Sequence, residues 1–273
     1  MDQIGKIMLL FIMILGLTAC ESEGSADAEW YQSTVAAAED EILFQTYELL
    51  QSEDPENENL AGMLQEQAAG AMVRISAGSL MGSGVIFHMD QKGMVILTAA
   101  HVLEDVKIGE GGLVATGTEL LEIELADGTV LSDKNNDKSK DEGGSWSVIL
   151  SQTSDLGIIT VPVEQITKEV FANCRYVPTD KEAFDALKVG DMILVMGSAK
   201  EVAGNAYEGT LTEPWIYLED YEQYMMLGHT YAQPGMSGGG VFDRHGRFIG
   251  ILSGADAKGD LAVVPLSIIL SEM

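Results

Sequence analysis

The stretch that decides the fold reads Gln233-Pro234-Gly235-Met236-Ser237-Gly238-Gly239-Gly240-Val241-Phe242-Asp243. It places one serine, Ser237, among glycines and directly before an apolar, strand-like segment. Glycine lets the backbone turn tightly and present its N–H groups outward. A hydroxyl beside such groups is the geometry of an activated nucleophile with an oxyanion hole. Taken alone, the pattern also fits a glycine-rich turn ahead of a strand, so the rest of the chain has to decide between the two interpretations.

The size and charge of the chain limit what it can be. Its 273 residues, 46% of them hydrophobic, suit one large domain with or without a small appendage, and all-β barrels commonly reach this length. The formal net charge of -28 argues against nucleic acid as a partner, because phosphate binding needs clustered Lys and Arg. The acidity favours a soluble, self-repelling surface, and attraction of basic polypeptides is the alternative.

The first twenty residues have the pattern of an export signal. Lys6 precedes an apolar run, Ile7 to Leu17, which is short for a bilayer span and typical of a signal-peptide core. The run ends in Leu17-Thr18-Ala19-Cys20, followed at once by polar residues, and this resembles a bacterial lipobox. The resemblance implies removal of residues 1–19 and attachment of diacylglycerol to the Cys20 thiol; the alternative is an ordinary signal peptide. We therefore expect an extracytoplasmic protein, anchored to the bacterial cell membrane through Cys20.

The chain has two cysteines. If Cys20 is lipidated, Cys174 has no partner for a disulfide and is expected to be a buried small hydrophobe. No motif surrounds Cys174, so a second nucleophile is not expected there.

Residues 20–70 are predicted to be a tether followed by a helical segment. Apolar residues at helical spacing predict one helix over about 33–51, and a second short helix begins near Leu60 and stops at Gly70. The apolar faces of these helices are expected to pack on the main domain or to form a spacer from the membrane. A partner-binding helix is the alternative.

From Ala71 the apolar pattern changes to the alternation of β-strands. A turn and strand, Gly82-Ser83-Gly84-Val85-Ile86-Phe87, precede a hairpin and a buried strand that ends in Thr98-Ala99-Ala100-His101-Val102-Leu103. These motifs closely resemble the first barrel of trypsin-like serine proteases, especially the bacterial HtrA/Deg branch and its single-domain relatives. The resemblance implies that His101 is the general base. The ordinary histidine pKa near 6.5 suits proton transfer at neutral pH. His88, His229 and His245 are expected to be ordinary residues; of these, His229, which lies near Ser237 in sequence, is the one other histidine to consider.

Asp155 stands at the head of a buried apolar strand, Leu156 to Val161, where an unpaired carboxylate would be costly. A partner is therefore expected. In the resembling family the same pattern carries the triad aspartate, which implies that Asp155 accepts a hydrogen bond from His101 and fixes its tautomer. A strand-capping aspartate in a turn is the alternative, and the presence of His101 upstream and Ser237 downstream argues against it.

The second half of the chain also resembles the HtrA/Deg pattern. In that family the strand corresponding to Leu252, Ser253 and Gly254 forms one wall of the primary substrate pocket and pairs with the substrate backbone by strand addition. The resemblance implies that Tyr231, six residues before Ser237, lies near the base of that pocket. No acidic residue stands there to receive Lys or Arg, so we expect small or apolar residues before the scissile bond.

Together these features predict a mainly β, two-barrel chymotrypsin-like serine protease domain over residues 71–273, ending in a short C-terminal helix. Barrel one is expected at about 71–163 and barrel two at about 187–264. The expected reaction is hydrolysis of polypeptides through an acyl-enzyme on Ser237, with the N–H groups of Gly235 and Ser237 as the oxyanion hole. No metal or organic cofactor is implied, and the sequence leaves the oligomeric state open. The alternatives are an inactive pseudoprotease that binds polypeptides and a purely structural lipoprotein.

Two positions of the serine stretch depart from the family. The family usually has Asn where Met236 lies and Pro where Gly240 lies. The oxyanion donors are backbone groups, so Met236 need not harm them, whereas Gly240 is expected to make the loop more flexible. The resemblance covers about residues 71–270, and a PDZ-like domain is not expected after it.

Overall fold

The computed structural model describes residues 44–51, 59–108, 115–116, 121–132, 146–198 and 204–273. The predicted signal peptide with Cys20, and most of the first predicted helix, lie outside the described residues. Within these ranges, no helix is both long and apolar enough to cross a bilayer.

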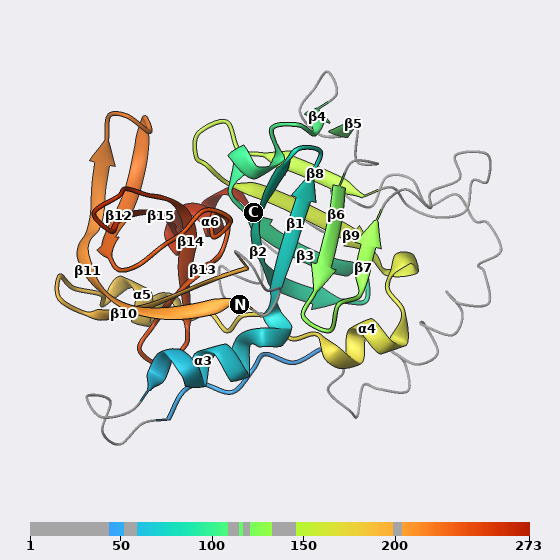
Figure 1. The fold of residues 1–273 in the computed structure, drawn as a ribbon, viewed down its shortest axis with the longest axis horizontal. Helices are drawn as coiled ribbons and strands as arrows, with labels where there is room; N and C mark the ends of the chain where they lie inside the picture. Colours follow the sequence, from blue (N-terminus) through green and yellow to red (C-terminus); the bar gives the residue numbers. More distant parts are fainter. Residues whose placement is uncertain (1–43, 52–58, 109–114, 117–120, 133–145, 199–203) are drawn as a thin grey trace, which may run out of the picture.

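The first half of the protein is an open seven-stranded antiparallel sheet in the order β7-β6-β1-β2-β3-β9-β8 (Figure 1). Its strands are β1 (Met72–Ala77), β2 (Leu80–Asp90), β3 (Gly93–Thr98), β6 (Leu121–Leu125), β7 (Val130–Ser132), β8 (Ser147–Leu150) and β9 (Gly157–Pro162). A separate two-stranded ribbon pairs β4 (Lys107–Ile108) with β5 (Ala115–Thr116). Alternate apolar side chains of the sheet, such as Ile75, Ile96 and Ile159, are fully buried in one core, as the period of two in the sequence predicts.

The second half is a closed barrel in the order β10-β11-β12-β15-β14-β13. Its strands are β10 (Met192–Gly197), β11 (Asn205–Leu218), β12 (Gln223–His229), β13 (Gly240–Asp243), β14 (Phe248–Ala255) and β15 (Asp260–Pro265). The register of the long strand β11 against β12 shifts around Glu213. The predicted mainly β, two-barrel architecture is confirmed, with the second barrel closed and the first one open.

Short helices connect and cover the two halves. Helix α3 (Leu60–Ala68) confirms the second predicted helix, and Asn59 caps it by accepting a hydrogen bond from the Gly62 N–H. It lies against β10 and β11. Helices α4 (Lys168–Asn173) and α5 (Lys181–Asp185) lie between the sheet and the barrel in the sequence, and α6 (Leu266–Glu272) is the predicted C-terminal helix. Single 3₁₀ turns lie at Ala69–Ala71, Ala100–Leu103 and Val163–Gln165.

Residues 44–51, here called the strap, are not helical, so the prediction of a helix reaching residue 51 is wrong in its described part. The Tyr47 hydroxyl donates to the carbonyl of Gly246 in the β13–β14 turn at 2.6 Å. The Phe44 ring packs edge-on against Phe171, in the core of the first half, with ring centroids 5.3 Å apart. The strap therefore contacts both halves, and these tertiary contacts outweigh its helical spacing.

Candidate active site

The first sheet brings His101 and Asp155 together. His101 lies in the 3₁₀ turn Ala100–Leu103, directly after β3, and Asp155 lies just before β9. Strands β3 and β9 are antiparallel neighbours, and their register pairs Thr98 with Gly157. The end of one strand and the beginning of the other therefore meet at the same edge, which places two residues 54 apart in sequence side by side.

The two side chains are hydrogen-bonded. Nδ1 of His101 lies 2.9 Å from Oδ2 of Asp155, and the backbone N–H of His101 donates to Oδ1 at 3.0 Å. A carboxylate only accepts, so Nδ1 carries the proton and Nε2 is left as an acceptor. The hydrogen bond to Asp155 is the main cause that raises the pKa of His101 above its usual 6.5, and partial burial acts in the opposite direction. The imidazole is still 43% exposed, so its Nε2 side can be reached from solvent.

Two further side chains hold Asp155, and neither role was predicted from the sequence. The Ser253 hydroxyl donates to Asp155 Oδ2 at 2.5 Å, although Ser253 was predicted only as part of a pocket wall. The backbone N–H of Asp155 donates to Oε1 of Gln223, at the start of β12, at 3.1 Å. Both partners come from the second barrel, so the carboxylate is oriented by both halves of the protein.

Ser237 lies in the loop between β12 and β13, and Ser83 of β2 ties this loop to the first sheet. The N–H of Ser83 donates to the Ser237 carbonyl at 2.8 Å, and its hydroxyl donates to the Gly235 carbonyl at 2.7 Å. The same hydroxyl accepts from the N–H of Ser198 at 2.7 Å. Ser83 is fully buried, so these bonds are shielded from water. In the sequence Ser83 stood out only as part of a motif.

Close backbone packing at Gly82 places Ser237 near the residues that follow β3. A Cβ atom at Gly82 would lie 2.6 Å from the Val102 side chain and 2.9 Å from the Ser237 carbonyl oxygen. The serine loop and the turn that carries His101 thus meet across this glycine. Among the described contacts, no hydrogen bond joins the side chains of His101 and Ser237.

Two glycines shape the serine loop itself. Gly235 has φ 93° and Gly238 has φ 83°, a left-handed conformation that glycine adopts without a steric penalty. At Gly238 a Cβ atom would also collide with the carbonyl oxygen of Ser83 and with Oγ1 of Thr98. The loop can dock on the first sheet only because residue 238 has no side chain.

Two N–H groups of the segment Gly235–Gly239 are free. In the described part of the chain, the N–H groups of Gly235 and Ser237 donate to no acceptor. The other three are engaged: Met236 donates to Gln233 O at 3.1 Å, Gly238 to Leu252 O at 2.7 Å and Gly239 to Met236 O at 2.9 Å. The two free donors are those that the sequence predicts for an oxyanion hole.

The two departures from the family pattern have structural explanations. The Met236 side chain is fully buried in the core of the second barrel, where it anchors the loop by apolar packing against Gly197. Gly240 is the first residue of β13 and pairs with Met196 on one side and Ile251 on the other. The prediction that Gly240 loosens the loop is therefore wrong, because strand pairing on both sides fixes its backbone.

The predicted substrate-binding residues fall into different environments. Leu252 is buried, and its backbone N–H and C=O bond to Gly239 and Gly238, so its prediction as a substrate-pairing residue is wrong. Strand β13 pairs with β14 only as far as Ile251, which leaves the edge of β14 around Gly254 without a strand neighbour in the described pairing. Tyr231 is 56% exposed and packs on the ring of Tyr207, with centroids 4.9 Å apart. The position of Tyr231 near the base of a substrate pocket stays a prediction.

Cys174 and the remaining titratable groups offer no second centre among the described residues. Cys174 is buried as predicted, and burial raises the pKa of its thiol to about 12, so it is not a nucleophile at neutral pH. No three His, Cys, Asp or Glu side chains gather as a metal site would require in the ranges that the structure describes. His229 forms an exposed pair with Asp260 at 3.0 Å, on β12 and β15.

Comparison with known protein families gives one match: residues 82–251 fit the trypsin-like peptidase domain. The chain belongs to this family. The match covers the three positions His101, Asp155 and Ser237, and it confirms the predicted family. A search of curated proteins found no match.

Solved structures with a similar fold are bacterial proteases. The HtrA-type protease AlgW with a tripeptide has a TM-score of 0.56 and 18% identity, and the match covers 77% of this chain and 61% of AlgW. The serine endoprotease from Yersinia pestis has a TM-score of 0.52 and 17% identity, with 77% and 64% covered. An inactive form of Rv3671c from M. tuberculosis H37Rv has a TM-score of 0.51 and 16% identity, with 81% and 93% covered. At these identities the similarity concerns the fold, and the chain spans less than two thirds of the HtrA-type relatives.

Proposed function

We propose that this protein is an extracytoplasmic serine endopeptidase in which Ser237 attacks the peptide carbonyl, His101 accepts its proton and Asp155 orients His101. The observation that carries the proposal is the 2.9 Å bond between Nδ1 of His101 and Asp155, because it leaves Nε2 as the proton acceptor on the exposed side of the ring. His101 then returns the proton to the leaving amine, and water releases the acyl group from Ser237 by the same route.

The free N–H groups of Gly235 and Ser237 support an oxyanion hole. A tetrahedral intermediate places negative charge on the former carbonyl oxygen, and preorganised N–H donors stabilise that charge without reorganising. The hydrogen bonds of Ser83 to the carbonyls of Gly235 and Ser237 restrain the backbone of the two residues that carry these N–H groups before substrate arrives. In our proposal the substrate backbone pairs with the open edge of β14 near Gly254.

Labelling with a fluorophosphonate tests the triad directly, because the reagent reacts with an activated serine. We expect the wild-type protein to be labelled and to cleave casein, and the Ser237→Ala variant to do neither. Equal labelling of the two proteins would place the reactive group elsewhere and contradict the proposal. Ser79→Ala is a suitable control, because Ser79 is an exposed serine whose only described side-chain bond is to Asp105.

A second candidate function, polypeptide binding without cleavage, draws on one observation: no hydrogen bond joins His101 to Ser237 among the described contacts. Such bonds are often long in ligand-free enzymes and tighten with substrate, so the endopeptidase remains our proposal. Binding of casein with no labelling of the wild-type protein would favour the second candidate.

Membrane attachment through Cys20 is part of the same proposal, and it rests on the lipobox pattern in the sequence. We expect a bacterial host that expresses the full chain to incorporate an alkyne-tagged fatty acid into the protein and to retain it in the membrane fraction. Cys20→Ser should abolish both. Tag incorporation that persists in Cys20→Ser would contradict a lipid anchor at this residue.

Substrate preference at the scissile bond is proposed to be small or apolar. The stretch before Ser237 contains no Asp or Glu between Thr230 and Met236, so no carboxylate there can pair with a basic side chain. Sequencing the products of a peptide library tests this point. Cleavage chiefly after Lys or Arg would contradict it.

A further inference from the structure

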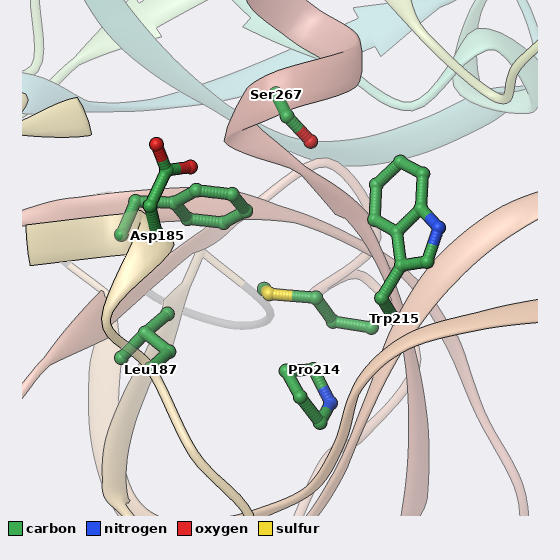
Figure 2. A pocket seen from close by; sticks show the side chains of 7 residues that line it. Asp185, Leu187, Pro214, Trp215 and Ser267 are labelled. Carbon is green, nitrogen blue, oxygen red and sulfur yellow. The ribbon is translucent and has the colours of Figure 1, made fainter. Parts of the chain in front are cut away.

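A pocket on the second barrel lies outside the proposed active site. Helix α5, the bulged part of β11, β12 and helix α6 form it, and its lining residues are Phe184, Asp185, Leu187, Pro214, Trp215, Met226 and Ser267 (Figure 2). Its volume is about 330 Å³, at the small end of the roughly 300–1,000 Å³ found for ligand pockets. None of the triad residues and no residue of the open β14 edge lines it.

Exposed aromatic rings form one wall of the pocket. Trp215 is 46% exposed, and its ring stacks on that of Tyr224 with centroids 5.0 Å apart and an interplanar angle of 13°. Tyr217 packs edge-on against Tyr224 at 5.3 Å. Stacking holds the indole in place while leaving part of it open to solvent. Such a ring attracts cations over its face and covers the methylene stem of Lys or Arg.

Two polar groups of the pocket can accept a hydrogen bond from a ligand. Among the described residues, Lys181, one turn earlier on the exposed surface of α5, donates to both carboxylate oxygens of Asp185, at 2.8 and 2.6 Å. Both side chains are 54% exposed, so this pair contributes little and another cation can replace Lys181. The Ser267 hydroxyl is buried and has no hydrogen-bond partner among the described residues. Figure 2 shows it on the side of the pocket that faces Trp215.

The charge of the chain segment that contains β11 and β12 favours a cationic ligand. Residues 201–243 contain no Lys and no Arg. Their acidic residues are Glu201, Glu208, Glu213, Glu219, Asp220, Glu222 and Asp243. An anionic ligand would meet only repulsion from this part of the chain, whereas a cationic one would be attracted.

We propose that the pocket is an exosite for one Lys or Arg side chain of a polypeptide substrate, at a position away from the scissile bond. The stem of the side chain lies against Trp215, Pro214 and Met226, and its head donates to the Asp185 carboxylate and the Ser267 hydroxyl. The identification of the ligand as a substrate rests on the proposed endopeptidase function. The preference of the pocket for a cationic side chain does not depend on that function.

The β11–β12 hairpin connects the exosite to the proposed active site. In the turn of this hairpin, the Tyr221 hydroxyl lies 3.2 Å from the position of a Cβ atom at Gly254, on the open edge of β14. Trp215 lies three residues before Leu218, where β11 ends, which corresponds to about 10 Å of strand. The same hairpin therefore carries residues beside both sites, and a substrate that pairs with β14 needs additional extended residues to reach the pocket.

Binding to the full chain carrying Ser237→Ala tests the exosite without cleavage. The probe is a fluorescein-labelled peptide of sequence Ala-Leu-Arg-Ala-Leu-Arg-Ala-Leu, and its partner carries glutamine in place of both arginines. Fluorescence anisotropy at physiological salt gives the Kd of each. We expect the arginine peptide to bind at least fivefold more tightly than the glutamine peptide. Adding Asp185→Asn or Trp215→Ala should weaken binding of the arginine peptide about tenfold.

Glu182→Gln is the matched control, because Glu182 is an exposed carboxylate on the same helix that does not line the pocket. It should leave Kd unchanged, whereas equal losses for Glu182→Gln and Asp185→Asn would indicate attraction by general charge and overturn the proposal. Trp215→Phe retains an aromatic wall and should weaken binding less than Trp215→Ala. If fluorophosphonate labelling of wild type fails while pocket-dependent binding persists, the endopeptidase function is lost and the cation site stands. If the wild-type protein is labelled normally but the Asp185 and Trp215 variants bind the arginine peptide with unchanged Kd, the exosite proposal is wrong and the endopeptidase proposal stands.

Discussion

The two halves of the protein contribute to the candidate site in different ways. The first sheet supplies side chains, His101 and Asp155, from the ends of two paired strands. The second barrel supplies Ser237 on a loop whose peptide groups matter as much as its side chain, because the free N–H groups belong to Gly235 and Ser237. The contribution of the first sheet depends on which side chains are present. The contribution of the second barrel depends on the backbone conformation of the serine loop, which glycine residues make possible.

Ser83 is where the two contributions meet. It belongs to the first sheet, yet its hydroxyl and N–H hold the carbonyls of Gly235 and Ser237. In return, the barrel provides Ser253 and Gln223 to orient Asp155. Each half thus positions reacting groups that belong to the other half. A substitution in one half should therefore change the activity that depends on residues of the other.

The largest effect on the first half is expected from Asp155→Asn. The amide cannot replace the carboxylate that accepts from His101 Nδ1, so the wrong tautomer becomes available and kcat should fall about 10⁴-fold. Hydrolysis of a peptide substrate checks this, with circular dichroism to show that the fold is kept. A loss below tenfold would mean that Asp155 is only a structural cap.

In the second half, a single added methyl group is expected to disrupt the serine loop. In Gly238→Ala the added methyl collides with Ser83 and Thr98, so the loop is displaced and its oxyanion donors with it. We expect a loss of about 10²–10³ in kcat. Gly190→Ala is the control: its φ is also positive, at 92°, but no atom lies within 4 Å of the new Cβ. That variant should lose stability of about 1–3 kcal/mol from backbone strain and keep its kcat.

Removing the hydroxyl of Ser83 tests the junction between the halves. Ser83→Ala removes the hydroxyl that accepts from the N–H of Ser198 in a buried position and donates to the carbonyl of Gly235 in a partly buried one. We expect the loss of these two hydrogen bonds to cost about 1–3 kcal/mol, which urea denaturation can measure. We also expect kcat to fall, by less than in Gly238→Ala, because the N–H of Ser83 still holds Ser237. Full activity with unchanged stability would show that the loop does not need this tie.

The smallest expected effect is a shift of the pH profile. His101 must be neutral to accept a proton, and its pKa is raised by the hydrogen bond to Asp155, so kcat/KM should rise with pH through a midpoint above 6.5. The charge of Glu104 raises the same pKa as the last of its causes. Glu104→Gln should therefore move the acid limb slightly to lower pH without changing the plateau. A midpoint that moves upward in this variant would contradict the assignment of the limb to His101.

Sequence patterns predicted the parts of the fold that depend on local alternation. The strands around Ile75, Ile96 and Ile159 follow from a period of two, because one face of each is buried. The strap was predicted wrongly since its conformation is set by partners such as Gly246, which lies 199 residues from Tyr47. The spacing of its apolar residues fits a helix equally well, and only the rest of the fold decides between the two.

The residues of the candidate site also divide into those that the sequence identified and those that it did not. His101, Asp155 and Ser237 stood out because their residue types and order match one chemistry, and the structure brings His101 and Asp155 into contact. Ser83 and Gln223 could not be found, because their partners lie 152 and 68 residues away and neither residue type is unusual in a strand. The exposure of Tyr231 could not be predicted for a related reason: a count of six residues before Ser237 gives a position along the chain, while exposure depends on packing against Tyr207.

The strap also has a consequence for the order in which the protein is completed. A chain is synthesised from its N-terminus, and domains fold as units once their residues are available. The strap is made early, but Tyr47 and Leu50 bond to the carbonyls of Gly246 and His245, near the end of the chain. Closing so long a loop carries an entropy cost that only the finished barrel can offset. The strap, which contains the first described residues to be synthesised, can therefore reach its native position only after the β13–β14 turn has formed.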